Sequence, residues 1–454
     1  MFTRLYLKNF RAFEEESVEL SKINLFFGPN NAGKSSLLSA LNLVCQTVQS
    51  SDIDADILLS GRFEDFGSYY DMVNGNDESK QITILIEAEL VVPKRSYVQP
   101  KRGGRLLRIK ETKHRGHLEI QIGYRKYRHE VRLLATEVRI PEENLLIRTR
   151  RNQLGRHVVD SMKGFKDLSI EKLDQMIFVR NLVPTILLPL ISHDAAYEEL
   201  RAIRSFTSAL RGQIKNVEFV GPFRSNPQRL YLLTGESPAN VGRHGERALE
   251  IMMQDEKRKG KEKKELMKLV SDWLKEAEVA KRIFTVPMTD RYFEVIVENF
   301  YTGEEENLTD VGFGCSQILP VLIAGFNVEE GGIFIVQEPE IHLHPKAQAE
   351  LGSVFKVLHK RGVQLIIETH SEHLLLRIQS HVARGDIKAK DVNVYYIDPA
   401  AKRKRKKAKT ITKIEIGEDG YFLKEWPRGF FPERLQEAER LAGLSITKQR
   451  LKVK

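Results

Sequence analysis

Apolar and polar positions along the chain predict short buried strands that alternate with helices. The run INLFF at 23–27 is short and mostly apolar, as in a strand covered on both faces. The residues after it place Leu37, Leu41 and Val44 on one side of a helix. Further strands are predicted at 82–92, 292–300, 331–338, 363–368 and 392–398, and an opening β-hairpin at 5–20.

Two stretches have helical patterns instead. One covers about 170–215, and the other is a highly charged stretch at 243–283. Sustained heptads are absent from the sequence, so long coiled-coil arms are not expected. Strands that alternate with helices on either side of a long insertion predict an α/β sheet that the insertion splits.

Composition narrows the class of protein. The chain has 454 residues, of which 41% are hydrophobic, enough for a sizeable core. Two cysteines, Cys45 and Cys315, cannot form a disulfide framework, which favours the reducing cytoplasm. The sequence contains no signal-like start and no apolar run of membrane-spanning length. We therefore do not expect a secreted mini-protein, a membrane protein or a low-complexity chain.

Positive charge is concentrated in one segment. Residues 94–157 hold 18 Lys and Arg against 6 Glu, a net charge of +12, whereas the whole chain carries +10. This segment is predicted to contact nucleic-acid phosphates, since tyrosines lie among its arginines. The alternatives are a solvated exterior or a surface for an acidic protein. The hexabasic run 402–407 is expected to be a solvated hairpin tip.

The strongest motif is the GxxxxGK[ST] pattern that follows the apolar run at 23–27. Its glycines let backbone N–H groups surround a phosphate at the start of a helix, where the helix dipole favours anions. Lys34 would neutralise phosphate oxygens, and the Ser35 hydroxyl is a hard ligand suited to Mg²⁺. The predicted nucleotide-binding residues are Gly28, Pro29, Asn30, Asn31, Ala32, Gly33, Lys34, Ser35 and Ser36.

An apolar strand that ends in polar groups follows about 300 residues later. Gln337, Glu338 and Glu340 are its candidates for holding the magnesium shell and orienting the attacking water. His342 and His344 are two residues apart, but neither a cysteine nor a third histidine lies near in the sequence. We assign them packing or interface roles rather than metal binding.

Two more segments end strands or begin helices. His370 follows a strand ending at Glu368, where it could bond a γ-phosphate, and Ser371 is the predicted N-cap of the next helix. A glycine turn before another apolar helix forms a second anion cradle. Cys315 within it is expected to be a small filler rather than a nucleophile. The residues of this cradle are Gly312, Gly314, Ser316 and Gln317.

These elements in this order resemble one family. INLFFGPNNAGKSSLL is similar to the Walker A segment of ABC-type ATPases related to SMC, RecF and the OLD nucleases, and LYLKNFRAF to their N-terminal strands. DVGFGCSQILP resembles their signature motif, IFIVQEPEIHLHP their Walker B and D-loop, and ETHSEHLLLRI their His-switch. GPFRSNPQRLY and IEIGEDGYFLKEWPRGFF resemble segments of the DUF3696 type of prokaryotic AAA/ABC ATPases.

The resemblance implies an ABC-type ATPase head, with a mixed β-sheet and flanking helices, split by a large basic α+β insertion. The expected domains are a head at 1–92 and 216–432, the insertion at 93–215, and a basic helix or tail at 433–454.

The resemblance also implies roles for individual residues. Lys34 and Ser35 would bind ATP phosphates and Mg²⁺, Glu338 would orient water, and His370 would sense the γ-phosphate. The signature glycine and serine would contact ATP held by a second subunit, so a head-to-tail homodimer with two nucleotides is the expected minimal unit.

Gln337 departs from the family, which has Asp or Glu at this position. Either Mg²⁺ is bound weakly and hydrolysis is slow, or Glu338 takes the metal role and Glu340 assists the water. We favour the first interpretation, because an amide lacks the charge of a carboxylate.

Three functions remain to be separated. Similar stand-alone ATPases serve bacterial anti-phage systems of the Septu and PARIS type, and this predicts a sensor and scaffold for a separate effector such as an HNH or Toprim nuclease. Since the sequence after His370 contains no Asp-x-Asp motif, a built-in nuclease is not expected. The alternatives are a RecF/SMC-like DNA-repair ATPase that binds duplex DNA through the basic insertion, and a nucleotide-binding module without turnover.

Overall fold

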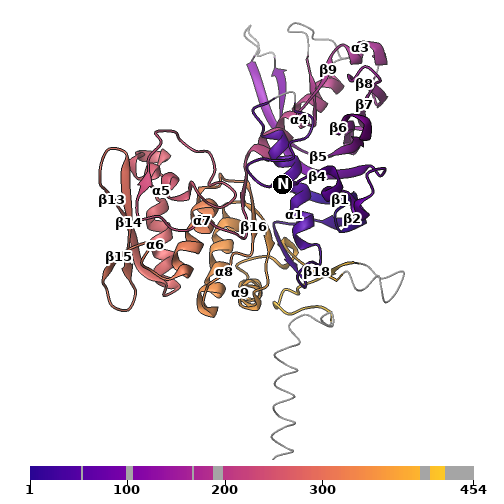
Figure 1. The fold of residues 1–454 in the computed structure, drawn as a ribbon. Coiled ribbons are helices and arrows are strands. Elements are labelled where there is room, and N and C mark those ends of the chain that lie inside the picture. Colours follow the sequence, from indigo (N-terminus) through magenta and orange to yellow (C-terminus); the bar gives the residue numbers. More distant parts are fainter. Residues whose placement is uncertain (53–54, 99–105, 166–167, 188–197, 399–409, 425–454) are drawn as a thin grey trace, which may run out of the picture.

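In the computed structural model of the protein, the described residues are 1–52, 55–98, 106–165, 168–187, 198–398 and 410–424 (Figure 1). The hexabasic run and the predicted C-terminal tail lie outside these residues. Within them, no helix is long and apolar enough to cross a membrane.

A six-stranded sheet lies at the centre. Its first five strands are parallel and only the last is antiparallel, so the α/β class and the mixed sheet are confirmed. The strand order is β11 (Val217–Val220), β16 (Ile333–Gln337), β17 (Gln364–Glu368), β3 (Ile23–Phe27), β18 (Val392–Ile397) and β19 (Ile411–Ile414). The helices that follow or flank these strands are α1 (Lys34–Val48), α7 (Phe313–Asn327), α8 (Pro345–Lys360) and α9 (Glu372–Ala383).

The central strands are mostly apolar because a hydrophobic core covers each face of the sheet. In β3, Leu25 and Phe27 point into one core together with residues of α7 to α9. Phe26 points into the other, which contains α1 and the second large sheet. Burial on both faces explains why this run is mostly apolar, with Asn24 its one polar residue.

The second sheet has seven antiparallel strands. Their order is β2 (Phe13–Glu19), β1 (Phe2–Phe10), β4 (Ile82–Val98), β5 (Leu106–Arg125), β6 (Glu130–Ile140), β7 (Leu145–Arg151) and β8 (His157–Lys163). β5 alternates, with Leu118, Ile120 and Ile122 buried. The predicted boundary between the head and the insertion, at residue 93, lies inside β4. Because β4 pairs with β1 on one side and with β5 on the other, the sheet continues across this boundary. The division into two domains remains a prediction.

Residues 170–215 are only partly helical. The prediction is confirmed for α3 (Ile170–Asp174) and α4 (Glu198–Lys215) but is wrong for 177–186, where β9 (Ile177–Arg180) and β10 (Val183–Ile186) form a hairpin. The hairpin turn has positive φ at Asn181 and Leu182. The Asn181 amide donates to the carbonyls of Thr47 and Asp52 at 3.0 and 2.8 Å. These contacts distant in sequence hold the turn, so local periodicity did not reveal it.

A smaller sheet and two helices form the remaining part, on the other side of α7 (Figure 1). The charged stretch 243–283 contains two helices and the start of a strand. The elements are β12 (Tyr231–Leu232), α5 (Ala248–Lys257), α6 (Leu266–Glu276), β13 (Ala280–Pro287), β14 (Tyr292–Asn299) and β15 (Glu305–Asn307). Short helical turns elsewhere are α2 (Tyr69–Met72), η1 (Asn74–Asn76), η2 (Lys126–Arg128), η3 (Pro141–Glu143), η5 (Gly260–Glu262) and η6 (Ala389–Asp391).

Candidate functional site

The glycine-rich loop connects the end of β3 to the start of α1. Gly28 has a φ of 148°, and a Cβ atom there would lie 2.4 Å from the carbonyl oxygen of Ile397. Only glycine fits this close approach without strain. Gly33 caps α1 in a left-handed conformation, so the loop turns directly into the helix N-terminus, as the sequence predicted.

Lys34 is folded back over this loop. Its ammonium donates to the carbonyl oxygens of Gly28 and Pro29, both at 3.0 Å, and only 4% of the residue is exposed. Burial lowers the pKa of Lys34, while Glu368 and Glu338 oppose that shift. The bonds to neutral carbonyls leave the positive charge of Lys34 available for an anion entering the loop.

A cavity of about 490 Å³ opens at the carboxyl ends of the central strands. It brings together the glycine-rich loop, the end of β16 and the end of β17, three segments far apart in the sequence. The lining residues are Asn30, Asn31, Lys34, Ser35, Glu338, Glu368 and His370. Ligands of parallel α/β sheets bind at this edge. Of the predicted nucleotide-binding residues, Ala32 is instead buried in the hydrophobic core.

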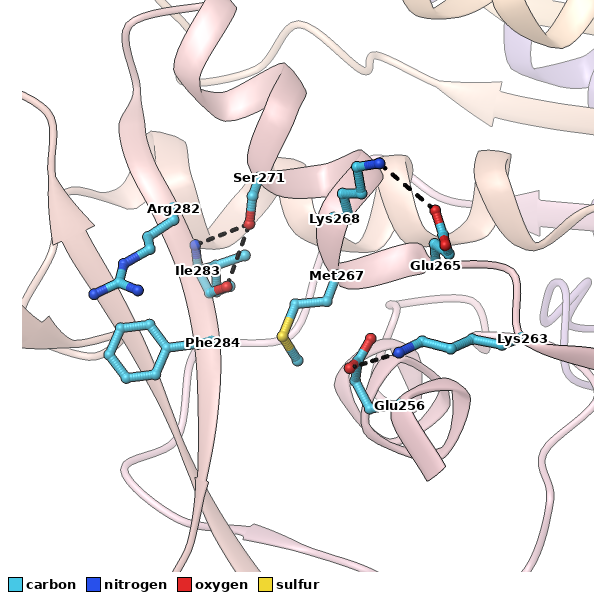
Figure 2. A pocket seen from close by; sticks show the side chains of 9 residues that line it. All are labelled: Glu256, Lys263, Glu265, Met267, Lys268, Ser271, Arg282, Ile283 and Phe284. Atoms are coloured by element: carbon cyan, nitrogen blue, oxygen red, sulfur yellow. Dashed lines mark hydrogen bonds and ion pairs between the residues drawn. The ribbon is translucent and has the colours of Figure 1, made fainter. Parts of the chain in front are cut away.

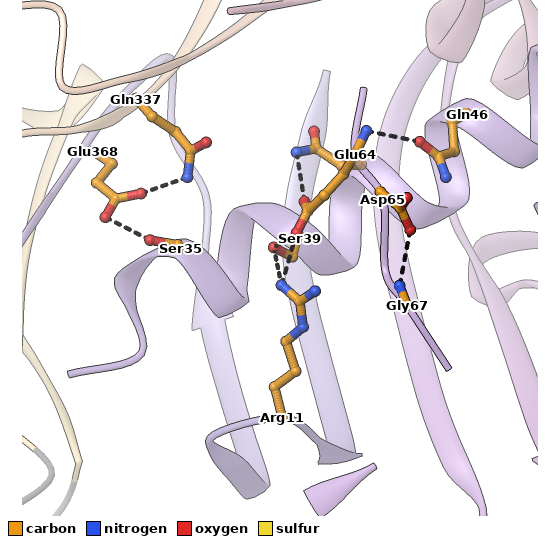
Figure 3. Close-up of polar contacts among 10 residues, drawn as sticks. Arg11, Ser35, Ser39, Gln46, Glu64, Asp65, Gly67, Gln337 and Glu368 are labelled. Atoms are coloured by element: carbon orange, nitrogen blue, oxygen red, sulfur yellow. Dashed lines mark hydrogen bonds and ion pairs between the residues drawn. The ribbon is translucent and has the colours of Figure 1, made fainter. Parts of the chain in front are cut away.

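Three side chains form a hydrogen-bonded row across the floor of this region (Figure 3). Ser35 Oγ donates to Glu368 Oε1 at 2.8 Å, and Gln337 Nε2 donates to Glu368 Oε2 at 2.7 Å. Burial raises the pKa of Glu368, although the bonds from Gln337 and Ser35 oppose the shift.

Glu338, Glu340 and His370 occupy different positions around the cavity. Glu338 lines it from a backbone with a positive φ of 45°, and its N–H donates to the Glu368 carbonyl at 2.7 Å. Glu340 is buried outside the lining, where one carboxylate oxygen accepts the His370 N–H at 2.5 Å. The His370 side chain faces the cavity, and both burial and Lys34 lower its pKa. Ser371 caps α9 as predicted, accepting a bond from Leu374 N–H.

The buried side chain of Arg224 contacts the backbone at the end of β16. Its guanidinium donates to the carbonyl oxygens of Gln337 and Glu338 at 2.9 and 3.0 Å, and 7% of the residue is exposed. Burial lowers the pKa of Arg224 to about 10, against the attraction of Glu340 and Glu338. Arg224 therefore fixes the strand end from which Glu338 reaches the cavity.

The predicted signature lies at the N-terminus of α7, away from the residues that line the same chain's cavity. Gly312 and Phe313 are exposed there, whereas Ser316 and Gln317 are each only 6% exposed. Ser316 Oγ donates to the Phe313 carbonyl at 3.1 Å. The Cα of Gly314 packs closely against the His342 carbonyl. Cys315 beside it is buried, which raises the pKa of its thiol to about 12, as expected for a filler.

The two histidines singled out in the sequence, His342 and His344, lie close to the start of α7 and at the start of α8. The rings of His342 and Phe313 lie 6.0 Å apart, and His344 caps α8. Within the described ranges, no cluster of three His, Cys, Asp or Glu side chains could hold a metal ion. A metal ion here would be held partly by oxygens of a bound phosphate, as Mg²⁺ is in nucleotide sites.

The donor set of the cavity suits such a magnesium ion. The Ser35 hydroxyl and the Glu368 carboxylate both offer oxygen ligands and meet at 2.8 Å, and Gln337, which is not among the lining residues, holds the carboxylate through its amide nitrogen. Mg²⁺ prefers hard oxygen ligands and is usually held by one or two protein groups together with phosphate oxygens.

A second hollow of about 410 Å³ lies between α5, α6 and β13 (Figure 2). Its charged side chains are paired with neighbours: Lys263 with Glu256 at 3.0 Å, and Lys268 with Glu265 at 3.8 Å. Arg282 lies over the Phe284 ring. Because these charges are already satisfied, the hollow is a weaker anion site than the cavity at Lys34.

Comparison with known proteins identifies the family. Residues 1–169 and 224–375 match the AAA ATPase domain family, and the chain belongs to it. The match implies a P-loop ATPase domain that binds ATP. The ATP-binding protein EcfA2 of the energy-coupling factor transporter from Streptococcus agalactiae serotypes Ia, V and III is 39% identical over 54 residues. That segment is 12% of this chain and 19% of the relative, so the chain spans about a fifth of these relatives.

Solved SMC heads have weak overall similarity. An SMC head bound to the C-winged helix domain of ScpA has a TM-score of 0.42 at 10% identity, covering 92% of this chain and 98% of the other. The SMC head domain of Thermotoga maritima has a TM-score of 0.34 at 8% identity, covering 92% and 99%. An SMC head from Pyrococcus furiosus, bound to the C-terminal domain of ScpA, has 0.40 at 11%, covering 91% and 96%.

Sequence reasoning did not single out Glu368 or Arg224 as site residues. Glu368 ends an apolar strand in the same way as Gln337, and this shared pattern was the available signal. Arg224 lies in an irregular segment whose sequence carries no sign that its side chain is buried beneath β16.

Proposed function

We propose that this chain is the ATP-binding and ATP-hydrolysing sensor and scaffold of a cytoplasmic bacterial anti-phage complex. It holds a separate effector, such as an HNH or Toprim nuclease, and releases or activates it on infection. The supporting observation is that one cavity contains Lys34 and Ser35 beside Glu338 and His370. The defence role itself rests on the resemblance to stand-alone ATPases of such systems.

The first test separates binding from hydrolysis. Lys34→Ala removes the cation of the loop and is expected to abolish binding of a fluorescent ATP analogue. Glu338→Gln keeps the size of the side chain but removes its charge, so binding persists and phosphate release falls about 100-fold or more. Lys268→Ala, on the exposed face of α6, is the matched control and retains both properties. Turnover by Glu338→Gln at the wild-type rate would show that Glu338 does not orient the water.

The proposed active unit is a head-to-tail pair in which the N-terminus of α7 covers the partner's ATP. Gly312 is exposed, and a Cβ atom there would meet nothing within 4 Å, so Gly312→Glu fits the folded subunit. In the pair, the new carboxylate would face a phosphate and repel it. We expect ATP to double the mass of Glu338→Gln protein in light scattering, and Gly312→Glu to prevent the doubling.

Gly212→Glu is the control for this test. It lies on α4, is equally exposed and has equally open surroundings. A Gly312→Glu protein that still pairs with ATP would exclude the proposed contact.

A second candidate function, DNA remodelling, is favoured by the hairpin tip between β5 and β6. Arg125, Lys126, Tyr127 and Arg128 are all exposed there, with the Tyr127 ring free in solvent. Among the described residues, none of these three cations forms a side-chain ion pair. An exposed aromatic ring between free cations is suited to base stacking and phosphate contact.

Fluorescence anisotropy with duplex DNA over a series of salt concentrations tests this function. Replacing Tyr127, Lys126 and Arg128 by Ala is expected to reduce affinity about tenfold and to lower the salt dependence. Lys113→Ala, whose ammonium is paired with Glu89 at 3.0 Å, is the control and changes little. If DNA binds both variants alike, the tip does not contact it.

A further inference from the structure

In the row of Ser35, Glu368 and Gln337, the carboxylate comes from β17, a strand on which the family pattern does not expect it. The family pattern has an acid at the end of β16, where this chain has Gln337. The acid in this chain ends the next strand, β17, and only 3% of Glu368 is exposed. Its two oxygens accept one bond each, from the Ser35 hydroxyl and from the Gln337 amide (Figure 3).

The order of the strands explains why Glu368 reaches the glycine-rich loop. β17 lies between β16 and β3, so its end is one strand closer to the loop than the end of β16. Gln337 and Glu368 are register partners, and Glu368 is in turn paired with Phe26, two residues before Gly28. A side chain at 368 therefore lies beside Ser35, while a side chain at 337 reaches Glu368 first.

The hydrogen bonds favour a cation beside Ser35. Because the hydroxyl gives its proton to Glu368, the free lone pairs of the Ser35 oxygen remain available to a metal ion. A buried carboxylate is costly without a neighbouring positive charge. The Lys34 ammonium attracts Glu368 but bonds to the carbonyls of the loop and not to this carboxylate. A neutral amide at 337 holds the carboxylate without repelling it, whereas an acid there would place two negative charges within 3 Å.

We propose that the Glu368 carboxylate and the Ser35 hydroxyl hold Mg²⁺ beside bound nucleotide. Gln337 is then a positioning residue that orients Glu368. This inference rests on the proposed nucleotide site. It replaces both sequence-based interpretations, in which Mg²⁺ is bound weakly or Glu338 takes the metal role. The charge missing at 337 is supplied from the neighbouring strand.

Calorimetry of ATPγS binding, in Mg²⁺ and in EDTA, tests the proposal without measuring turnover. Wild-type protein is expected to bind ATPγS more tightly in Mg²⁺. In Glu368→Gln that enhancement falls about 10- to 100-fold, while affinity in EDTA is kept. Glu372→Gln, in the first turn of α9, is the matched control and keeps the full enhancement.

The sharper test exchanges the two side chains. The double variant Gln337→Glu with Glu368→Gln again places one carboxylate and one amide side by side, so it is expected to recover part of the enhancement. A double variant that behaves like Glu368→Gln alone would contradict the expected exchange, whereas partial recovery supports the placement of Glu368 next to Ser35. Recovery beyond the wild-type value would contradict that placement.

Other results would overturn the proposal. A Glu368→Gln protein that keeps the wild-type enhancement, or that loses binding in EDTA while its melting curve is unchanged, would show that Glu368 does not act through Mg²⁺. If Glu368→Gln does not fold, Glu368→Asp keeps the charge but withdraws it by one methylene, and an undiminished enhancement would have the same meaning. Wild-type protein that binds equally in both buffers contradicts this inference alone. Absence of binding in both buffers contradicts the proposed function as well.

Discussion

The two large sheets of this protein differ in whether their ionisable side chains are buried or exposed. In the six-stranded sheet, several ionisable groups near the strand ends are buried, among them Glu368, Glu218 and Arg224. In the seven-stranded sheet, charges are numerous and lie on the outer face as ion pairs, such as Lys113 with Glu89 and Arg115 with Glu87.

The free-energy cost of removing one partner of a charged pair differs between the two sheets. A buried charge loses its hydration and depends on specific partners, so removing one partner is expensive. An exposed pair gains little because water and salt screen it. The buried groups therefore hold a defined arrangement around the cavity, while the exposed pairs keep a surface soluble.

This difference changes the interpretation of the basic segment. Its net charge of +12 was counted within 94–157, but several of its cations pair with acids outside those limits. Arg115 pairs with Glu87, Lys113 with Glu89, and Arg151 with Asp56. Among the described residues, the excess of positive charge that a partner could use is smaller than the sequence suggests, and it includes the exposed cations of the hairpin tip.

The largest expected effect tests the buried side of the comparison. Arg224→Met keeps the length of the side chain but leaves the Gln337 and Glu338 carbonyls without their donor. Glu340 nearby also loses its positive neighbour. We expect the free energy of unfolding, measured by urea denaturation, to fall by about 3–5 kcal/mol.

Arg115→Met is the matched arginine in the exposed sheet. The Arg115 side chain is 56% exposed and pairs with Glu87 on the adjacent strand. Its loss should cost less than about 1 kcal/mol. Equal losses for the two variants would remove the distinction between the sheets.

A smaller effect concerns Glu218 on β11, and it depends on pH. Burial raises the pKa of Glu218 to about 8, although the Val241 N–H donates to its carboxyl at 2.9 Å. Between about pH 5 and pH 8 the folded protein keeps this proton and the unfolded chain releases it, so stability falls as pH rises. The slope approaches about 1.4 kcal/mol per pH unit.

Glu218→Gln cannot titrate and keeps an oxygen for Val241. Its stability relative to wild type should therefore increase steadily from pH 5 to pH 8 in thermal melting. A difference that stays constant over this range would mean that Glu218 is ionised in the folded protein.

Much of the fold could be predicted because its signals are local. The strand at 23–27, the loop at 28–35 and the helix after it form one continuous stretch of sequence, and all three were found in place. The hairpin at 177–186 was missed because distant carbonyls, those of Thr47 and Asp52, hold its turn.

The candidate site divides in the same way. Lys34, Ser35, Glu338 and His370 could be selected from strand ends and glycine patterns, and the structure places them around one cavity. Glu368 could not be ranked above Gln337, since both end apolar strands. Only the pairing of β17 with β3 decides which of them lies beside Ser35.

The sequence by itself determined that a phosphate-binding loop follows a buried strand, because eight consecutive residues carry all the backbone geometry which that loop needs. The tertiary structure alone decided which carboxylate faces the loop and which basic residues remain unpaired. Both depend on strand order and register, which bring together side chains as far apart in sequence as Lys113 and Glu89, 24 residues, or Ser35 and Glu368, 333 residues.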